Sequence, residues 1–347
     1  MVVEATCGRG DLHVACTRWK RKDVFQGLKS RVFKGRSSAR LNSCPFLFRP
    51  IKLKPDAVPN FRTPREACLL IDSHAHLDSP RYADDREAML GRAWEAGVGA
   101  VLSIGIGEGP EEMHQALDLC RQFNARRANG ASLPRLYASA GIYPHSIVAA
   151  DDTALAKLDA LLAEPEVIAC GEIGLDYYHE GASHDVQRQG LIRQLEIAAA
   201  GRRPILIHCR GTNESTDAWD DLFVVLEEHW QKTGLGGVMH CFGAGWDQAR
   251  RSLDMGFLVS FAGNLTYPKA QPLRDVAARM PLDGVLVETD APWLAPAPQR
   301  GQRNEPAFVV QTARTLAGLL NVSESDIAAA TTKNFNRLFQ LHPDVGN

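Results

Sequence analysis

Several features that would place this chain in a common protein class are missing from its 347 residues. No run of 18 apolar residues occurs, so the sequence predicts no membrane-spanning helix. The eight cysteines include no C-x-x-C pair, which favours reduced thiols in a reducing compartment over a disulfide framework. No G-x-G-x-x-G follows a predicted strand, and this argues against a doubly wound dinucleotide-binding sheet. These absences leave an ordinary globular enzyme or binding protein as the expectation.

The charge of the chain is unevenly distributed. Residues 1–66 carry 15 Lys and Arg against 5 Asp and Glu, whereas residues 67–347 carry 24 against 36. Residues 1–66 also lack a sustained helical or strand period, so we expect a basic, poorly ordered extension. Four interpretations of it stay open: an organellar transit peptide, a basic arm that contacts nucleic acid, an over-extended start of the reading frame, and a solvated tail without function.

From residue 67 onward, short apolar runs alternate with stretches of helical period. Eight predicted strands, each followed by a predicted helix, match an α/β fold of the (β/α)8 TIM-barrel type. The strand hydrophobicity is continuous, which suits parallel strands covered on both faces. The predicted strands are 68–73, 99–104, 136–142, 167–173, 204–209, 236–241, 256–261 and 284–289. The predicted helices are 83–96, 110–127, 152–163, 184–200, 214–232, 246–255, 270–279 and 305–340.

Side chains of the kind that bind metals gather where these strands end. In a TIM barrel the C-terminal strand ends form the active site. Residues two apart on a strand point to the same face, so the two histidines of His74-Ala75-His76 aim at one point. Burying so many polar groups without a shared partner would be costly, and a bound metal supplies that partner. The strand-end residues are His74, His76, His145, Glu172, His208, His240, Glu288 and Asp290.

Four imidazoles and two or three carboxylates exceed what one tetrahedral ion needs. We therefore expect two divalent ions, with Mg, Mn, Zn or Co all acceptable to such a mixed set. Glu172 is the natural bridging carboxylate because its strand lies opposite the first one. Asp290 is expected to ligate a metal and to orient or deprotonate the attacking water. Glu288 is expected either to support a ligand or to act as a general base.

Other residues near the predicted mouth suit a phosphate-containing substrate. Arg210 follows His208 by two residues, and its guanidinium could hold phosphate oxygens. The loop after the last strand adds Arg300, Arg303 and Asn304, and Trp293 offers a face on which a base could stack. His145 completes the predicted substrate-binding residues. For the loop, a solvated turn before the closing helix is an equally good interpretation.

Five segments, taken together and in this order, resemble the TatD family of metal-dependent deoxyribonucleases. They are Ile71-Asp72-Ser73-His74-Ala75-His76-Leu77-Asp78, Gly171-Glu172-Ile173-Gly174-Leu175-Asp176-Tyr177, Ile207-His208-Cys209-Arg210, His240-Cys241-Phe242 and Glu288-Thr289-Asp290-Ala291-Pro292. Gly263-Asn264-Leu265-Thr266-Tyr267 and the 300–306 loop are also similar. The resemblance covers residues 69–340. It implies a barrel hydrolase of the amidohydrolase kind that cleaves DNA with Mg²⁺, Mn²⁺ or a similar ion, and metal ligands at His74, His76, Glu172, His208, His240 and Asp290.

The sequence departs from the family pattern at two places. Where the family commonly shows Gly-x-His-Pro-His, this chain has Tyr143 in place of the first histidine, so no role of that histidine carries over. After His240-Cys241-Phe242, a small hydroxyl residue is replaced by the turn Gly243-Ala244-Gly245, which removes the hydrogen bond that such a hydroxyl could give to substrate.

The sequence therefore predicts a metal-dependent deoxyribonuclease, acting as a 3'-5' exonuclease on single-stranded or frayed ends. The acidic body argues against broad wrapping of duplex DNA. Two alternatives stay open: hydrolysis of a small amide, ester or aminoacyl-tRNA, and an inactive barrel that serves as a binding module. No Lys occurs between Lys157 and Lys232 to supply the carbamylated bridge common in amide hydrolases of this kind. We expect a cytoplasmic protein, with organellar targeting by residues 1–66 as the alternative in a eukaryote, and a monomer as one option for its undetermined oligomeric state.

Overall fold

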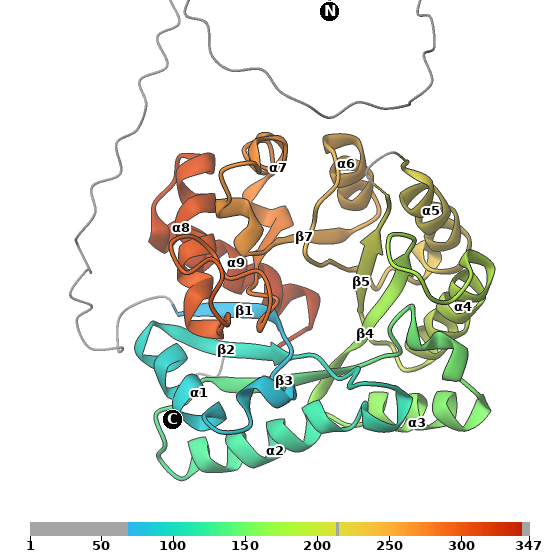
Figure 1. Ribbon diagram of the computed structural model, residues 1–347, viewed down its shortest axis with the longest axis horizontal. Helices are drawn as coiled ribbons and strands as arrows, with labels where there is room; N and C mark the ends of the chain where they lie inside the picture. The colour runs from blue at the N-terminus through green and yellow to red at the C-terminus, as the bar shows by residue number, and fades with distance from the viewer. Residues whose placement is uncertain (1–68, 213–214, 342–347) are drawn as a thin grey trace, which may run out of the picture. The chain divides into compact units, whose positions relative to one another are not determined.

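Eight parallel strands, hydrogen-bonded in the order β1 to β8, form the sheet of this protein (Figure 1). The computed structural model describes residues 69–212 and 215–341, so the predictions about residues 1–66 lie outside the described residues. The strands are β1 (Leu70–Ala75), β2 (Val98–Ser103), β3 (Arg135–Ala140), β4 (Val167–Asp176), β5 (Ile205–Arg210), β6 (Gly237–Met239), β7 (Phe257–Phe261) and β8 (Val285–Val287). The predicted (β/α)8 barrel is confirmed.

Helices surround the strands and alternate with them along the chain (Figure 1). The α-helices are α1 (Arg86–Glu95), α2 (Gln115–Ala128), α3 (Asp152–Leu162), α4 (His184–Ala200), α5 (Asp217–His229), α6 (Trp246–Asp254), α7 (Gln271–Ala277), α8 (Val309–Leu320) and α9 (Glu324–Leu338). Short 3-10 turns are η1 (Pro80–Tyr82), η2 (Pro110–Glu112), η3 (Ser146–Ala149), η4 (Gln231–Thr233), η5 (Gly263–Thr266), η6 (Leu282–Gly284) and η7 (Pro306–Phe308).

The barrel is nearly closed by a narrow junction between its first and last strands. Ala75 and Ala291 form an isolated parallel bridge, and the backbone N–H of His76 donates to the carbonyl of Ala291 at 2.8 Å. The backbone N–H of Asp290 donates to the carbonyl of His74 at 3.0 Å. These bonds bring together the ends of segments that are more than 200 residues apart, and with them three of the predicted ligands.

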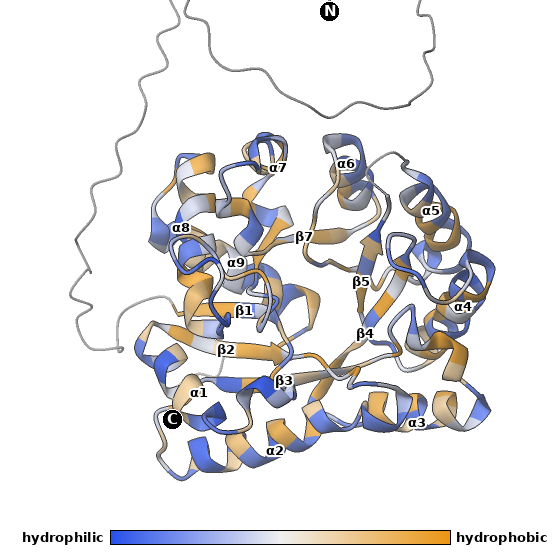
Figure 2. Ribbon diagram, in the orientation of Figure 1, coloured by the Kyte–Doolittle hydropathy of each residue, from blue (hydrophilic) through white to orange (hydrophobic). Residues whose placement is uncertain are grey.

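Two apolar clusters stabilise the barrel. The larger one fills the space between the strands and the surrounding helices, and Figure 2 shows strands that are mostly hydrophobic beside helices with mixed faces. The smaller one includes inward-facing residues such as Leu206, Val238 and Leu286, together with Phe335 and Phe339 at the end of α9. Burial of apolar surface contributes about 25 cal/mol per Å² to the free energy of folding. The interior of the barrel is thus a packed core rather than a pore.

The last helical region is two helices rather than the single predicted one over 305–340. Helix α8 ends at Leu320, and its C-cap residue, Asn321, adopts the left-handed conformation with φ 55°. Helix α9 then begins with a capping box, in which the Ser323 side chain accepts from the backbone of Asp326 and the Asp326 side chain accepts from the backbone of Ser323. Asn tolerates the left-handed conformation better than most residues, so the break follows from local chemistry.

Gly174 on β4 lies against the neighbouring strand too closely for any side chain. Its φ is +145°, and a Cβ atom built there would lie 1.9 Å from the carbonyl oxygen of His208. The backbone of β4 can therefore approach β5 only because this residue is glycine. The approach fixes the relative position of Glu172 and His208, which come from these two strands.

No helix among the residues that the structure describes is long and apolar enough to cross a membrane. Within the described residues, Cys120, Cys170, Cys209 and Cys241 are free thiols.

Candidate metal centre

A layer of polar side chains lies directly above the apolar filling of the barrel. On three strands, an apolar residue of the barrel filling is followed two positions later by a polar one: Leu206 by His208, Val238 by His240, and Leu286 by Glu288. Because residues two apart share a face, each polar side chain points into the barrel above its apolar neighbour. The sequence alternation therefore builds a polar floor at the C-terminal mouth.

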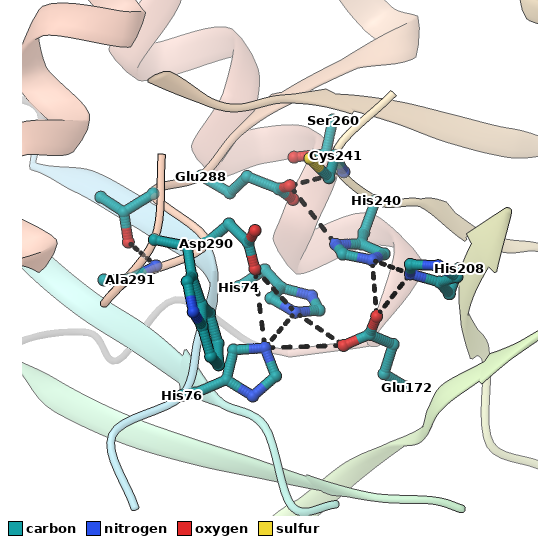
Figure 3. A network of polar contacts seen from close by, with 12 residues as sticks. His74, His76, Glu172, His208, His240, Cys241, Ser260, Glu288, Asp290 and Ala291 are labelled. Atoms are coloured by element: carbon teal, nitrogen blue, oxygen red, sulfur yellow. Dashed lines mark hydrogen bonds and ion pairs between the residues drawn. The ribbon is translucent and has the colours of Figure 1, made fainter. Parts of the chain in front are cut away.

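Six predicted ligands meet at this floor, five of them in two sets and Glu172 between the sets (Figure 3). The first set contains His74, His76 and Asp290, with His74 Nε2 and His76 Nε2 3.2 Å apart and Asp290 Oδ1 at 3.8 and 3.6 Å from them. The second contains His208 and His240, with His208 Nδ1 3.3 Å from His240 Nε2. All six predicted ligands come together once Glu172 is added.

The carboxylate of Glu172 lies between the two sets, with one oxygen directed to each. Its Oε2 lies 3.3 Å from His74 Nε2 and 3.5 Å from His76 Nε2. Its Oε1 lies 2.8 Å from His208 Nδ1 and 2.9 Å from His240 Nε2. Ligand atoms around a tetrahedral zinc ion with bonds of about 2.0–2.1 Å are separated by about 3.3 Å. The spacing within each set therefore fits a divalent ion, and Glu172 is placed to serve both.

The electrostatics of the metal-free site centre on Glu172 and His240. Burial alone would raise the pKa of Glu172, but the charge of His240 and hydrogen bonds from His208, His240 and His74 hold it well below its ordinary value. Burial would lower the pKa of His240, yet the charge and hydrogen bonds of Glu172 and Glu288 raise it well above normal. A proton on His240 thus balances Glu172 in the absence of metal, and an arriving cation would replace that proton.

Each imidazole of the second set has a carboxylate behind it. Glu288 lies 3.5 Å from His240 Nδ1, on the side of the ring away from Glu172, and is fully buried. Asp176 Oδ2 lies 3.3 Å from His208 Nε2, again opposite the nitrogen that faces Glu172. A carboxylate on the outer nitrogen of a ligating histidine fixes its ring and makes it a better ligand. Glu288 is therefore placed to hold the ring of His240.

Asp72 and Thr289 hold the ends of the first and last strands together. The Asp72 carboxyl accepts from the backbone N–H of Thr289 at 2.9 Å and from its hydroxyl at 2.6 Å. The backbone N–H of His74 also donates to Asp72, at 3.3 Å. Asp72 is fully buried, and burial raises its pKa to about 8. This contact lies next to both Asp290 and His74, so it positions two predicted ligands.

The predicted substrate-binding residues fall into two groups. Trp293 is half-exposed and its ring meets the edge of His76 at 4.9 Å between centroids. Arg210 is exposed and lies 4.0 Å from the centre of the Tyr178 ring, and exposed Arg300 lies 4.6 Å from that of Tyr267.

The second group has partners within the protein. Arg303 pairs with Asp85 at 2.7 Å and donates to the carbonyl of Arg81 at the same distance. Asn304 is buried, and its amide donates to the carbonyls of Thr289 and Trp293. These contacts anchor the 300–306 loop and occupy both side chains.

His145 lies apart from Glu172, beside two residues to which sequence reasoning assigned no role. Its Nε2 is 3.5 Å from Asp176 Oδ2, and the hydroxyl of Tyr143 lies 3.2 Å from the same oxygen. The position of Asp176, four residues after Glu172 on the same strand, could have identified it. Ile173 and Leu175 face the outer core, so the alternate residues Glu172 and Asp176 share the inner face. Asp72 gave no comparable signal, since its role depends on Thr289, 217 residues away.

Comparison with known proteins places this chain in one family. A family model described as TatD related DNase matches residues 71–340. The uncharacterized metal-dependent hydrolase YcfH of Escherichia coli (strain K12) is 36% identical over 275 residues, covering 78% of this chain and 96% of its own length. The 3'-5' ssDNA/RNA exonuclease TatD of Erwinia tasmaniensis is 30% identical over 277 residues, covering 78% of this chain and all of its own.

A solved structure agrees with these sequence matches. The crystal structure of YjjV, a TatD homologue from Escherichia coli, aligns with a TM-score of 0.69 at 32% identity, covering 79% of this chain and 99% of that one. The chain belongs to the TatD family of metal-dependent hydrolases.

Proposed function

We propose that this TatD-family hydrolase cleaves DNA phosphodiester bonds, as a 3'-5' exonuclease on single-stranded or frayed ends, at a centre of two divalent ions. The observation that carries the proposal is the position of Glu172, whose two oxygens each face a separate set of imidazoles. Two-metal phosphodiesterases and related hydrolases hold their ions about 3.5–4 Å apart. The name of the Erwinia tasmaniensis relative gives the substrate class and the polarity that we carry over.

His74, His76 and Asp290 would hold one ion, His208 and His240 the other, and Glu172 both. Bound ions would lower the pKa of a coordinated water and shield charge that develops on phosphorus. Asp290 would accept the proton of the attacking water, because 15% of its side chain is exposed and it can pass that proton to solvent. Glu288 has no exposed side-chain surface and would instead hold His240 in place.

The rim of the mouth supplies contacts for a strand end. Arg210 and Arg300 are exposed guanidiniums beside aromatic rings, and no carboxylate of the described residues is found within ion-pair distance of either. Both could bind phosphates that flank the scissile bond. Trp293 would stack on a base next to the first metal set. The acidic balance of residues 67–347 favours a confined site for one strand over a groove for duplex DNA.

A substrate panel tests the proposal. Single-stranded DNA, duplex DNA with frayed or blunt ends, and RNA, each labelled at the 5' end, are incubated with Mg²⁺, Mn²⁺ or Zn²⁺. Aminoacyl-tRNA and small esters and amides form the remaining arms. Stepwise shortening of single-stranded DNA from its 3' end is expected. Intact DNA with every metal would refute the proposal, and turnover confined to the ester, amide or aminoacyl arms would replace it.

A matched pair of variants ties the activity to the site. Asp290→Asn removes the proposed proton acceptor and should lower the cleavage rate by about 100-fold or more. Asp283→Asn changes an exposed aspartate just before β8 and should leave the rate unchanged. Equal rates in the two variants would show that cleavage comes from elsewhere in the preparation.

A further inference from the structure

A second polar cluster lies beside the candidate metal centre and is built from His145, Asp176 and His179. Their ligand atoms all lie within 4.8 Å of one another. His179 Nδ1 is 2.8 Å from Asp176 Oδ2, and His145 Nε2 is 3.5 Å from the same oxygen. The cluster thus presents two imidazole nitrogens and one carboxylate oxygen to a common point.

The two oxygens of Asp176 have different surroundings. Oδ1 accepts from the backbone N–H groups of Tyr178 and His179, both at 3.0 Å. Oδ2 faces only side chains, those of Tyr143, His208, His145 and His179. The loop that carries His179 therefore fixes the carboxylate through Oδ1 and leaves Oδ2 available as a ligand.

His145 lacks the hydrogen bonds that a buried imidazole normally has. Both of its ring nitrogens are shielded from solvent, and neither has a hydrogen-bond partner within the described part of the chain. Gly181 passes so close that a Cβ atom there would lie 2.2 Å from Nδ1, which leaves Nε2 as the nitrogen directed to Asp176. A buried polar group without a partner costs about 1–3 kcal/mol, and a ligand at Nε2 would remove that cost.

The chemistry of the cluster favours a cation over an anion. Asp176 is fully buried, and its Oδ2 lies within 3.5 Å of imidazole nitrogens of His145, His179 and His208. A carboxylate at the centre of the cluster would repel a phosphate group and attract a cation. Two histidines with one carboxylate are, in contrast, a common ligand set for Zn²⁺ and other divalent transition metals.

We propose that His145, Asp176 and His179 bind a third divalent ion, next to the two that the proposed function places at Glu172. His208 connects the sites, because its Nδ1 faces Glu172 and its Nε2 faces Asp176. The half-exposed side chain of His179 leaves this ion open to the mouth, where Arg210 and Tyr178 lie. There it could bind an oxygen of a phosphate that flanks the scissile bond.

Metal stoichiometry tests the proposal without any measurement of activity. The full chain is stripped with chelator, titrated with Zn²⁺, desalted, and analysed for metal per protein. We expect three equivalents in the wild type and two in His179→Gln. The control is His184→Gln, which removes an exposed histidine five residues further along and should keep three equivalents.

The outcomes separate this inference from the proposed function. A wild type that binds two equivalents, with the same number in His179→Gln, overturns the third site and leaves the proposed function intact. Three equivalents in both proteins also overturn it, because the third ion would then lie elsewhere. Fewer than two in the wild type overturn both proposals.

Cobalt spectroscopy checks the position of the third ion. In His179→Cys, the third equivalent of Co²⁺ should produce a thiolate-to-cobalt charge-transfer absorption that the wild type lacks. A third equivalent that binds without this absorption would show that residue 179 does not contact the ion.

Discussion

Replacing Asp72 by Asn should stabilise the metal-free protein relative to the wild type, by an amount that grows as the pH rises. Asp72 is fully buried at the junction of the first and last strands, where it bonds to Thr289. Burial raises its pKa from 3.8 to about 8, although the hydrogen bonds from Thr289 oppose the shift. At neutral pH the folded protein therefore keeps a proton on Asp72 that the unfolded chain has released. Asn has the same shape and no charge.

The sign and size of the effect follow from that proton. Between about pH 4 and pH 8 the folded state binds one more proton at Asp72 than the unfolded state, so this group lowers the free energy of unfolding as the pH rises. The slope is about 1.4 kcal/mol per pH unit. Because Asp72→Asn lacks the group, its stability relative to the wild type should increase by about 1.4 kcal/mol per unit between pH 5 and pH 7.

Urea denaturation of the chelator-treated proteins at pH 5, 6 and 7 measures this difference. Asp72→Ala serves as a control, because it also lacks the charge but leaves the N–H and hydroxyl of Thr289 without a partner. It should be about 2–4 kcal/mol less stable than Asp72→Asn at each pH. A difference between Asp72→Asn and the wild type that stays constant from pH 5 to pH 7 would refute the assignment of a buried, protonated Asp72.

Three further predictions concern the metal centre. Glu172→Gln should weaken Zn²⁺ binding more than 100-fold in a competition titration. Losing a residue that only supports a ligand already costs about 10–100-fold in metal affinity, and Glu172 is proposed as a direct ligand of both ions. Unchanged affinity would contradict that shared role. Zn²⁺ binding should release protons and weaken as the pH falls, because His240 holds its proton more firmly than an ordinary histidine. Calorimetry in buffers of different ionisation enthalpy measures the number of protons released. Zn²⁺ affinity that is independent of pH would disprove the prediction. Gly174→Ala should abolish metal binding by separating β4 from His208 on β5, since the added Cβ would lie 1.9 Å from the His208 carbonyl oxygen; wild-type metal content in a folded variant would count against that packing.

The sequence predicted the barrel because its period of alternating strands and helices is a local property. All eight strands lie within a few residues of the predicted runs, and seven of the eight predicted helical regions contain one α-helix. The exception is the region 305–340, where Asn321 and the Ser323 cap divide the helix. The signal was weak there, since the position three after Ser323 is Asp326 rather than the Glu or Gln of the usual capping box.

The candidate ligands were also readable from the sequence, because each follows an apolar strand in a fold whose strand ends converge. The residues that hold these ligands in place could not be identified from the sequence. Asp176 has an ordinary spacing from Glu172, yet its importance depends on His208, His145 and His179, which the fold brings to one carboxylate oxygen. The contacts of Arg303 with Asp85 and of Asn304 with Thr289 are likewise not readable from a linear sequence.

The amino-acid sequence by itself thus determined the class of fold and the kinds of atoms at the mouth of the barrel. Local periodicity and residue type are sufficient for both. Only the tertiary structure decided which nitrogen faces which carboxylate oxygen: one oxygen of Glu172 to each pair of histidines, and Asp176 to His208, His145 and His179. Those pairings depend on the register between neighbouring strands and on the junction between β8 and β1. Both are set by packing between segments that lie far apart in the chain.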